Sequence, residues 1–265
     1  MRFKEKWYKK IVAKYRNSKA KILSKKMHDA IKKCPDKIPT IIVSYNNGVY
    51  VDNIVSQLSN HSITPIIIDN KSTHQGTLGI LEKIERLEKG IVVYSNKNFG
   101  HMVGFLEPIY KTLPEIFAYT DPDLELNQNL PINFIEIMRD LTNEYQVYKV
   151  GLALDLLYDQ QFVKKTHTLK RQKPFSWQKD VSIRDIEEKY WRKKIQHKEF
   201  ELYAASTDTT FSVYNKKNFN GDFYDSLRIA DTFSAIHLPW FPELDLMNDL
   251  DRAQYMQKNK STTSI

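Results

Sequence analysis

Two aspartates separated by one residue, Asp121 and Asp123, are the first candidates for chemistry in this sequence. They follow the apolar run 116–120, which is typical of a buried strand, and Pro122 between them restricts the backbone of the turn. Side chains at positions i and i+2 of an extended segment point the same way. Two carboxylates on a rigid turn suit a divalent cation that also holds a diphosphate. An ordinary Asp-Pro turn after a strand is the alternative.

Three other apolar runs in the same half end in polar turns. They lie at 40–44, 65–69 and 90–95, and each is followed by a stretch of helical periodicity, the last of them at 102–113. Strands that alternate with helices predict an α/β fold with a mostly parallel sheet flanked by helices. Ligands of such sheets bind beyond the carboxyl ends of the strands. We therefore expect the polar turns to converge on the edge that carries the two aspartates.

The second half is less regular. A helix is expected at 131–141, a strand at 147–156 that ends near Asp155, and an extended segment at 200–214. A further apolar run, 235–240, surrounds His237.

Residues 2–31 have the pattern of a basic amphipathic helix. Apolar residues recur along one side, and 13 Lys and Arg against two acidic residues lie within positions 1–33. The rest of the chain holds 27 basic and 30 acidic residues, so the net charge of +8 comes from this segment. Such a helix suits an anionic membrane surface. A helix that packs its apolar side on the body of the protein is an equal alternative, and a nucleic-acid-binding arm is a weaker one.

Composition restricts the class of protein further. The single cysteine, Cys34, excludes an intrachain disulfide framework and a cysteine-based zinc site. A reducing cytosol is the simplest location. No apolar run approaches the length of a membrane-spanning helix, and the first residues lack the apolar segment of a signal peptide. We expect a cytoplasmic protein that is peripheral on the inner face of the cytoplasmic membrane.

Four motifs carry a resemblance to a known family. They are IIVSYNN, IIIDNKST, VVYSNKNFG and YTDPDLE, in that order within residues 39–127. This stretch resembles the nucleotide-binding half of family 2 glycosyltransferases with the GT-A fold, a Rossmann-like arrangement. The later segments STDTTF and AIHLPW look like those of a subset that makes bacterial surface polysaccharide. The resemblance implies a catalytic domain at 37–256, with a nucleotide-binding half at 37–127 and an acceptor-binding half at 128–256. The residue pattern adds a basic helical extension at 1–36 and a polar tail at 257–265.

The resemblance assigns roles to the residues of the polar turns. Those implied to bind the nucleotide are Ser44, Tyr45, Asn46, Asp69, Asn98, Gly100 and Asp121. Asp69 matches the acidic residue that contacts uracil in the family, and Asp121 matches the first acid of the DxD motif, near the ribose. Asp123, the second acid, is implied to bind Mn²⁺ or Mg²⁺. The cation would stabilise the charge that develops on the diphosphate leaving group.

An inverting transfer also needs a base that deprotonates the acceptor hydroxyl. Asp208 lies about where the family places this base; a strand-end aspartate that bonds to neighbouring backbone is the alternative. Asp222 and Asp225 are weaker candidates, as is Asp155. His237 is a candidate second metal ligand, against the alternative of a buried histidine satisfied by backbone. Residues that could bind the acceptor are Trp177, Trp191, Trp240 and Asp155, with Tyr190 beside them.

Two departures from the family pattern matter. The segment after Asp69 reads Asn-Lys-Ser-Thr rather than Gly-Ser-x-Asp, which leaves the preferred nucleotide open. The Gln-x-x-Arg-Trp motif of processive polysaccharide synthases is absent from the sequence, which favours transfer of one sugar per encounter.

The sequence therefore predicts a metal-dependent glycosyltransferase. We expect it to move one sugar from a nucleotide-sugar donor, most simply a UDP-sugar, to a glycan or lipid-linked acceptor in bacterial surface polysaccharide synthesis, with inversion. A sugar nucleotidylyltransferase is less favoured, because the turn after the first strand holds only Gly48. A membrane- or nucleic-acid-binding module with a decayed site is the other alternative. No nucleic-acid partner is expected, and the N-terminal helix makes a homodimer possible.

Overall fold

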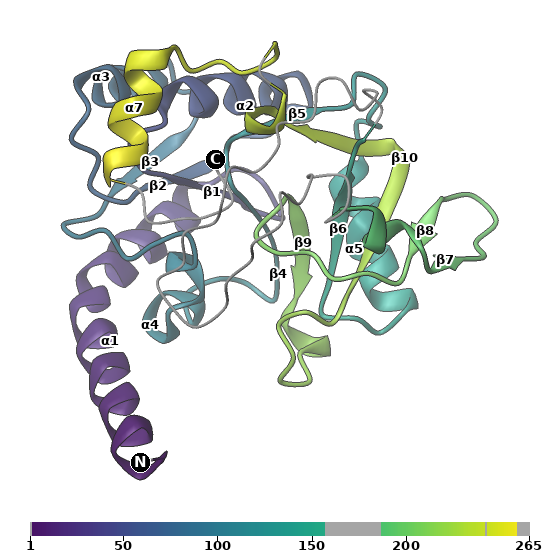
Figure 1. The fold of residues 1–265 in the computed structure, drawn as a ribbon, viewed down its shortest axis with the longest axis horizontal. Helices are drawn as coiled ribbons and strands as arrows, with labels where there is room; N and C mark the ends of the chain where they lie inside the picture. The colour runs from purple at the N-terminus through teal and green to yellow at the C-terminus, as the bar shows by residue number, and fades with distance from the viewer. Residues whose placement is uncertain (1, 157–186, 242, 259–265) are drawn as a thin grey trace, which may run out of the picture. The chain divides into compact units, whose positions relative to one another are not determined.

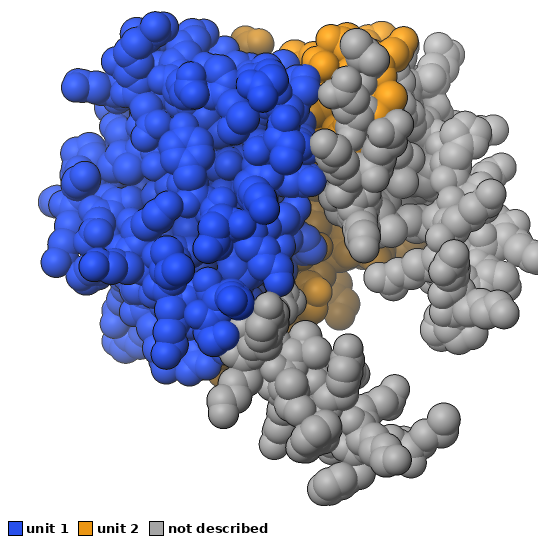
Figure 2. Space-filling model, turned by 90° about the vertical axis from the view of Figure 1, so that its left-hand side faces the viewer, with its two compact units in different colours: residues 1–122, 209–217 blue, residues 123–208, 218–265 orange. Residues whose placement is uncertain are grey.

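The computed structural model describes residues 2–156, 187–241 and 243–258 (Figure 1). The chain forms two compact units, coloured separately in Figure 2. The first comprises Met1–Pro122 and Thr209–Lys217, and the second comprises Asp123–Asp208 and Asn218–Ile265. The first unit includes a segment from late in the chain because the strand formed there pairs with an earlier strand of that unit.

A mostly parallel sheet forms the centre of the first unit. Its strands are β1 (Thr40–Ser44), β2 (Ile66–Asp69), β3 (Ile91–Tyr94), β4 (Ile116–Thr120) and β9 (Ser212–Asn215). The first four run parallel in the order β3-β2-β1-β4, and β9 is antiparallel to β4. The register pairs Ser44 with Asp69 and Asp69 with Tyr94, so these strands end at one edge. The Ile- and Val-rich strands are buried because helices cover both faces.

Helices lie on both sides of these strands. α2 (Gly48–Asn60) and α3 (Gln75–Arg86) pack together on one side, and α1 (Arg2–Lys33) packs with α4 (Glu107–Tyr110) on the other (Figure 1). The α/β fold predicted from the alternating pattern is thereby confirmed. The single helix predicted at 102–113 was wrong. The structure has a 3-10 helix, Val103–Phe105, an extended residue at Leu106, and then α4, whose first turn holds Pro108. Proline is tolerated in the first turn of a helix but not in its interior.

The second half of α1 packs on the first unit. Leu23, Met27 and Ala30 are buried, and the Lys26 ammonium donates to the Tyr94 carbonyl at 2.8 Å. Ile22, an apolar residue beside Leu23 in the predicted amphipathic helix, is 61% exposed. The apolar side of this half of the helix is therefore used within the protein. Among the described residues, no helix has the length and apolar character needed to span a membrane.

An aromatic cluster joins β4 and β9. Phe117 and Tyr214 stack with ring centroids 5.1 Å apart, and Phe105 packs edge-on against Tyr119 at 4.7 Å. The Tyr119 hydroxyl donates to the His101 carbonyl at 2.6 Å and accepts from the Gly104 amide at 3.1 Å. These contacts fix the chain between β3 and β4, just before the two aspartates.

The second unit is built around one long strand, β10 (Ser226–His237). It runs parallel to β6 (Lys149–Leu154) and antiparallel to β5 (Leu124–Leu126) and β8 (Leu202–Tyr203), and β7 (Lys194–Ile195) pairs with β8. α5 (Phe134–Glu144) packs on β6, and α7 (Asp249–Lys258) follows later in the chain. Short 3-10 helices lie at Glu188–Trp191, Lys216–Asn218 and Leu238–Trp240.

Candidate functional site

The turns after β1 and β2 are joined through Asn46. Its side-chain oxygen accepts from the amides of Thr73, at 2.7 Å, and His74, at 3.0 Å, and its own amide donates to the Ser72 hydroxyl at 2.8 Å. Asn46 has a φ of 54°, in the left-handed region that asparagine tolerates better than most residues. Ser44 takes part nearby, donating from its hydroxyl to the Asn47 side chain at 3.0 Å. The two turns therefore form one preorganised structure.

Asp69 is the last residue of β2 and lies within the two joined turns. Its carboxylate is 2% exposed and accepts from the Ser72 amide at 3.1 Å. Burial raises the pKa of Asp69, and the hydrogen bonds from Ser72 and the Lys71 backbone oppose that rise. A buried acceptor at the carboxyl end of a strand can receive an N–H group of a base. Contact of Asp69 with the base of a nucleotide stays a prediction.

The turn after β3 is attached to the turn after β2. Asn70 donates from its side chain to the Gly100 carbonyl at 3.0 Å and accepts from the Phe99 amide at 3.3 Å. Asn98 accepts from the Gly100 amide at 2.8 Å, and Gly100 has a φ of 84°, which favours glycine. Asn98 and Gly100 are exposed, whereas Tyr45 is half-buried. The predicted nucleotide-binding residues after β1, β2 and β3 thus belong to one hydrogen-bonded set of loops.

Asp121 follows β4 and pairs with Thr209 of the same unit. The Asp121 amide donates to the Thr209 carbonyl at 3.1 Å, and the Thr209 hydroxyl donates to a carboxylate oxygen of Asp121. Both contacts extend the antiparallel pairing of β4 with β9. The carboxylate of Asp121 is therefore held in one orientation at the carboxyl end of its strand.

Asp123 lies beside His237 in the second unit. The β5–β10 register pairs Leu124 with His237, and the Leu238 amide donates to the Asp123 carbonyl at 3.0 Å. Asp123 Oδ2 is 3.3 Å from His237 Nε2, and the carboxylate is 8% exposed. Burial favours the neutral carboxyl, but the charge and hydrogen bond of His237 outweigh burial and lower the pKa of Asp123. The sequence predicted these two residues as metal ligands, and the structure brings them together.

Two polar atoms of this pair are buried and have no hydrogen-bond partner in the described part of the chain. Asp123 Oδ1 and His237 Nδ1 make no hydrogen bond to any described residue. Such atoms are uncommon in folded proteins because an unpaired buried group costs free energy. A carboxylate oxygen and an imidazole nitrogen are suitable ligands for a divalent ion such as Mn²⁺. Among the described residues, no three His, Cys, Asp or Glu side chains converge as a metal site. The pair fits a cation that takes its remaining ligands from elsewhere.

Asp208, the predicted base, is exposed and lies next to a buried lysine. Lys149 Nζ donates to the carbonyls of Thr207, at 2.7 Å, and Asp208, at 3.1 Å, and lies 3.8 Å from the centroid of the Phe223 ring. Burial lowers the pKa of Lys149 to about 7, and the charge of Asp208 opposes this shift. The Thr207 amide also donates to the Ser226 hydroxyl at 3.0 Å. The backbone that carries Asp208 is therefore fixed.

The residues predicted to bind the acceptor lie in different surroundings. Trp240 is half-buried, with its ring 4.7 Å from that of His237. Asp155 accepts from the Ser234 hydroxyl at 3.1 Å on β10. Trp191 packs edge-on against Tyr203 at 5.2 Å and belongs to a small apolar cluster. Trp177 lies outside the described residues.

The other predicted residues are Tyr190, half-buried in the 3-10 helix Glu188–Trp191, and Asp222 and Asp225, in the turn before β10. Tyr190 covers the Arg228 guanidinium at 4.1 Å. Asp222 accepts from the Tyr224 amide, and Asp225 accepts from the Asn220 side chain, both at 2.9 Å. These hydrogen bonds stabilise the turn before β10.

Sequence reasoning missed several residues that organise the site. Thr209 orients Asp121, Ser72 and Asn70 join the loops, and Lys149 fixes the segment at Asp208. Only Lys149 had a signal in the sequence, because it is a charged residue near the start of the apolar run 147–156. The others are polar residues in polar turns, where sequence does not distinguish a bonded side chain from a solvated one.

The fold defines an α/β protein with hydrogen-bonded polar loops at the carboxyl ends of its parallel strands, the edge where ligands of such sheets bind in general. The family model described as glycosyl transferase family 2 matches residues 40–219. The chain belongs to this family, which confirms the resemblance and the enzyme class predicted from the four motifs. A search of curated proteins gave no significant match.

Solved structures similar to this chain include three glycosyltransferases or related proteins. One is S. aureus TarS 1–349, with 15% identity, a TM-score of 0.39, and coverage of 68% of this chain and 47% of that chain. Another is the mannosyltransferase PcManGT from Pyrobaculum calidifontis with GDP-Man and Mn²⁺, with 14% identity, a TM-score of 0.36, and coverage of 55% and 46%. The third is GalNAc-T7 with UDP, GalNAc and Mn²⁺, with 13% identity, a TM-score of 0.49, and coverage of 85% and 46%. The chain spans about half the length of each of them.

Proposed function

We propose that this protein transfers one sugar from a nucleotide-sugar donor, preferentially a UDP-sugar, to an acceptor hydroxyl with the help of Mn²⁺ or Mg²⁺. The observation that carries the proposal is the pair Asp123 and His237, in which each side chain has one buried polar atom without a hydrogen-bond partner among the described residues. These two residues would hold the cation, which supplies charge neutralisation to the diphosphate leaving group when bound. Nucleotide-binding enzymes commonly hold Mg²⁺ by one or two carboxylates together with substrate phosphates.

The loops of the first unit bind the nucleotide in this proposal. Asp69 accepts a hydrogen bond from the base, while Asn46 keeps the turns after β1 and β2 in place. Asp121, oriented by Thr209, accepts from the ribose hydroxyls. Because the loops are already joined by hydrogen bonds, little conformational entropy is lost when the nucleotide binds.

Asp208 acts as the base. Its carboxylate takes the proton of the acceptor hydroxyl while the oxygen of that hydroxyl bonds to the anomeric carbon. The bond between that carbon and the phosphate oxygen breaks, and its electron pair leaves with the nucleoside diphosphate. A single displacement of this kind inverts the anomeric configuration. Lys149 holds the backbone carbonyl of Asp208 and so fixes the position from which the carboxylate acts.

We further propose that the acceptor is a glycan or a lipid-linked glycan of bacterial surface polysaccharide synthesis, reached at the cytoplasmic face of the membrane. Support comes from the segments STDTTF and AIHLPW and from the basic residues of α1. Co-sedimentation with vesicles of anionic phospholipid tests the membrane contact. Salt-sensitive binding supports it, and equal recovery with zwitterionic vesicles contradicts it.

A thermal-shift titration tests the function. The purified chain is titrated with UDP, GDP, CMP and their sugars, with and without Mn²⁺, beside Asp123→Ala and a control variant, Asp52→Asn, at an exposed position. We expect a Mn²⁺-dependent increase in Tm for one nucleotide that Asp123→Ala loses and the control retains. The absence of any shift in a folded sample would contradict the transferase and favour a binding module with a decayed site.

A further inference from the structure

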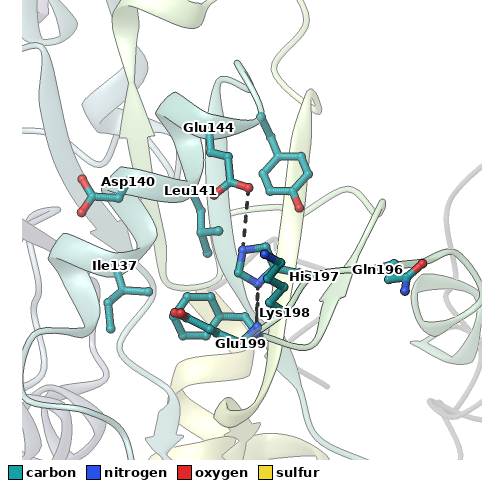
Figure 3. Close-up of a pocket in the computed structure, with 10 residues that line it drawn as sticks. Ile137, Asp140, Leu141, Glu144, Gln196, His197, Lys198 and Glu199 are labelled. Carbon is teal, nitrogen blue, oxygen red and sulfur yellow. Dashed lines mark hydrogen bonds and ion pairs between the residues drawn. The ribbon is translucent and has the colours of Figure 1, made fainter.

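A pocket of about 660 Å³ lies in the second unit, apart from the residues assigned above. One wall is the C-terminal part of α5 with the residue that follows it, and the other is the segment 196–200 between β7 and β8 (Figure 3). Its volume falls in the range of small-molecule sites, about 300–1,000 Å³. α5 is anchored by its buried face, which includes Phe134, Met138 and Leu141, so this wall is fixed.

The His197 ring, a polar group of the pocket, is held in place by hydrogen bonds. Its Nδ1 accepts from the amides of Glu199, at 3.1 Å, and Phe200, at 3.0 Å, so the ring carries its proton on Nε2. Nε2 faces the Glu144 carboxylate at 3.7 Å, as Figure 3 shows. The ring is stacked on Phe200, with centroids 5.2 Å apart and planes 17° apart, and Phe200 packs against buried Phe233. A flat, preformed surface with one N–H donor results.

The charges of the lining restrict the occupant. Glu144 and Glu199 lie in the lining with one basic residue, Lys198. Asp140, also in the lining, pairs with Arg139 at 2.8 Å, and its carboxylate points away from His197 (Figure 3). Carboxylates accept hydrogen bonds from hydroxyl groups and repel phosphates, so this lining disfavours a nucleotide or another anion. A ligand rich in hydroxyl groups and without negative charge is the complementary one.

The same pocket has an apolar part. Ile137 and Leu141 of α5 and the ring of Phe200 face it, and the Tyr145 ring lies 6.4 Å from that of His197. Sugar rings combine an apolar C–H face with a border of hydroxyl groups. Aromatic and aliphatic side chains contact the face, whereas Glu144 and His197 can bond to the hydroxyls.

We propose that this pocket binds a neutral sugar ring of the acceptor glycan. Glu144 accepts from sugar hydroxyls, the His197 Nε2–H donates to one, and the Tyr145 and Phe200 rings contact the C–H face. That the sugar belongs to the acceptor rests on the proposed function, because a transferase with a glycan acceptor needs a second sugar site. Sugar binding itself does not depend on it.

Saturation-transfer NMR on the full chain tests the proposal. The probes are the methyl glycosides of glucose, galactose, mannose, rhamnose, N-acetylglucosamine and N-acetylgalactosamine. Glu144→Gln is compared with Glu82→Gln, the same change at an exposed position of helix α3. We expect saturation of at least one glycoside, and an increase in its Kd of about tenfold in Glu144→Gln, which loses a charged acceptor, with no change in Glu82→Gln.

A second variant, His197→Gln, keeps the test decisive if Glu144→Gln fails to fold. The proposal is overturned if no glycoside receives saturation, or if both folded pocket variants bind like the wild type. UDP-dependent thermal shifts are recorded on the same samples. Normal UDP shifts without glycoside binding contradict only the sugar pocket, whereas glycoside binding without any nucleotide shift contradicts the proposed transfer.

Discussion

The loops after β1, β2 and β3 in the first unit and the Asp123–His237 pair of the second use their polar groups in opposite ways. In the loops, the side chains of Asn46, Asn70 and Ser72 form hydrogen bonds to neighbouring turns. In the pair, Asp123 Oδ1 and His237 Nδ1 have no hydrogen-bond partner in the part of the chain that the structure describes. The loop side chains already have hydrogen-bond partners within the protein, whereas each side chain of the pair keeps one polar atom without a partner among the described residues.

Under the proposed function, this difference separates residues that shape the site from residues that bind the cation. A polar side chain whose bonds are satisfied within the protein contributes to stability, and its loss should lower the free energy of unfolding. A buried polar side chain with an open position contributes little to stability, and its loss should affect binding and catalysis instead. Substitutions in the two regions should therefore have different signatures.

The largest effect is expected for Asp123→Asn. The variant keeps the shape of the side chain but removes the charge that would hold the cation, so release of UDP from the donor should slow about 100-fold or more. The free energy of unfolding should change much less than in the loop variants. Steady-state UDP release beside urea unfolding measures both. A large loss of unfolding free energy with UDP release retained would contradict the expected difference between the pair and the loops.

Gly104→Ala should destabilise the scaffold before β4. A methyl group there would lie 2.3 Å from Cε2 of the Tyr119 ring, which is fully buried. Overpacking of this kind costs about 3 kcal/mol. The matched control is Gly79→Ala on α3, where the added methyl group meets no atom of the described residues within 4 Å, and a gain of about 0.5–1 kcal/mol is expected. Urea unfolding of the two variants measures the contrast, and equal effects would refute it.

Asn46→Ala should cost about 2 kcal/mol of unfolding free energy. It removes the acceptor of two amides and places alanine at a positive φ. Asn46→Gly restores the backbone freedom but not the acceptor, so it should recover part of the loss. Thermal or urea unfolding of both variants separates the two causes. Wild-type stability in Asn46→Ala would mean that the side chain is not needed to join the loops.

Lys149 should make stability depend on pH. Its pKa in the folded protein is about 7, against an ordinary value of 10.5, so the unfolded chain binds more protons between these values. Stability should therefore rise with pH above about 7 relative to Lys149→Met, by about 2 kcal/mol between about pH 7 and pH 9. Below pH 7 this contribution to the slope disappears. Parallel curves of unfolding free energy against pH for the wild type and Lys149→Met across this range would contradict the low pKa of Lys149.

The sequence determined the class of fold because alternating apolar runs and helical stretches record which segments are buried on both faces. It also placed Asp69, Asp121 and Asp123 at strand ends, since the polar turn follows each apolar run directly. The helix expected at 102–113 failed because Pro108 fits only in a first turn, and periodicity does not report where a helix starts.

Only the tertiary structure decided which side chains from distant parts of the sequence contact one another. Asp123 meets His237, 114 positions later, because β5 pairs with β10 in one register, and a shift by one residue would turn the histidine to the other face. Thr209 reaches Asp121 only because β9 returns to β4. The pocket of α5 and residues 196–200 likewise joins segments that are distant in sequence. Local patterns specify strands and turns, but pairing register and long-range packing set which side chains share a site.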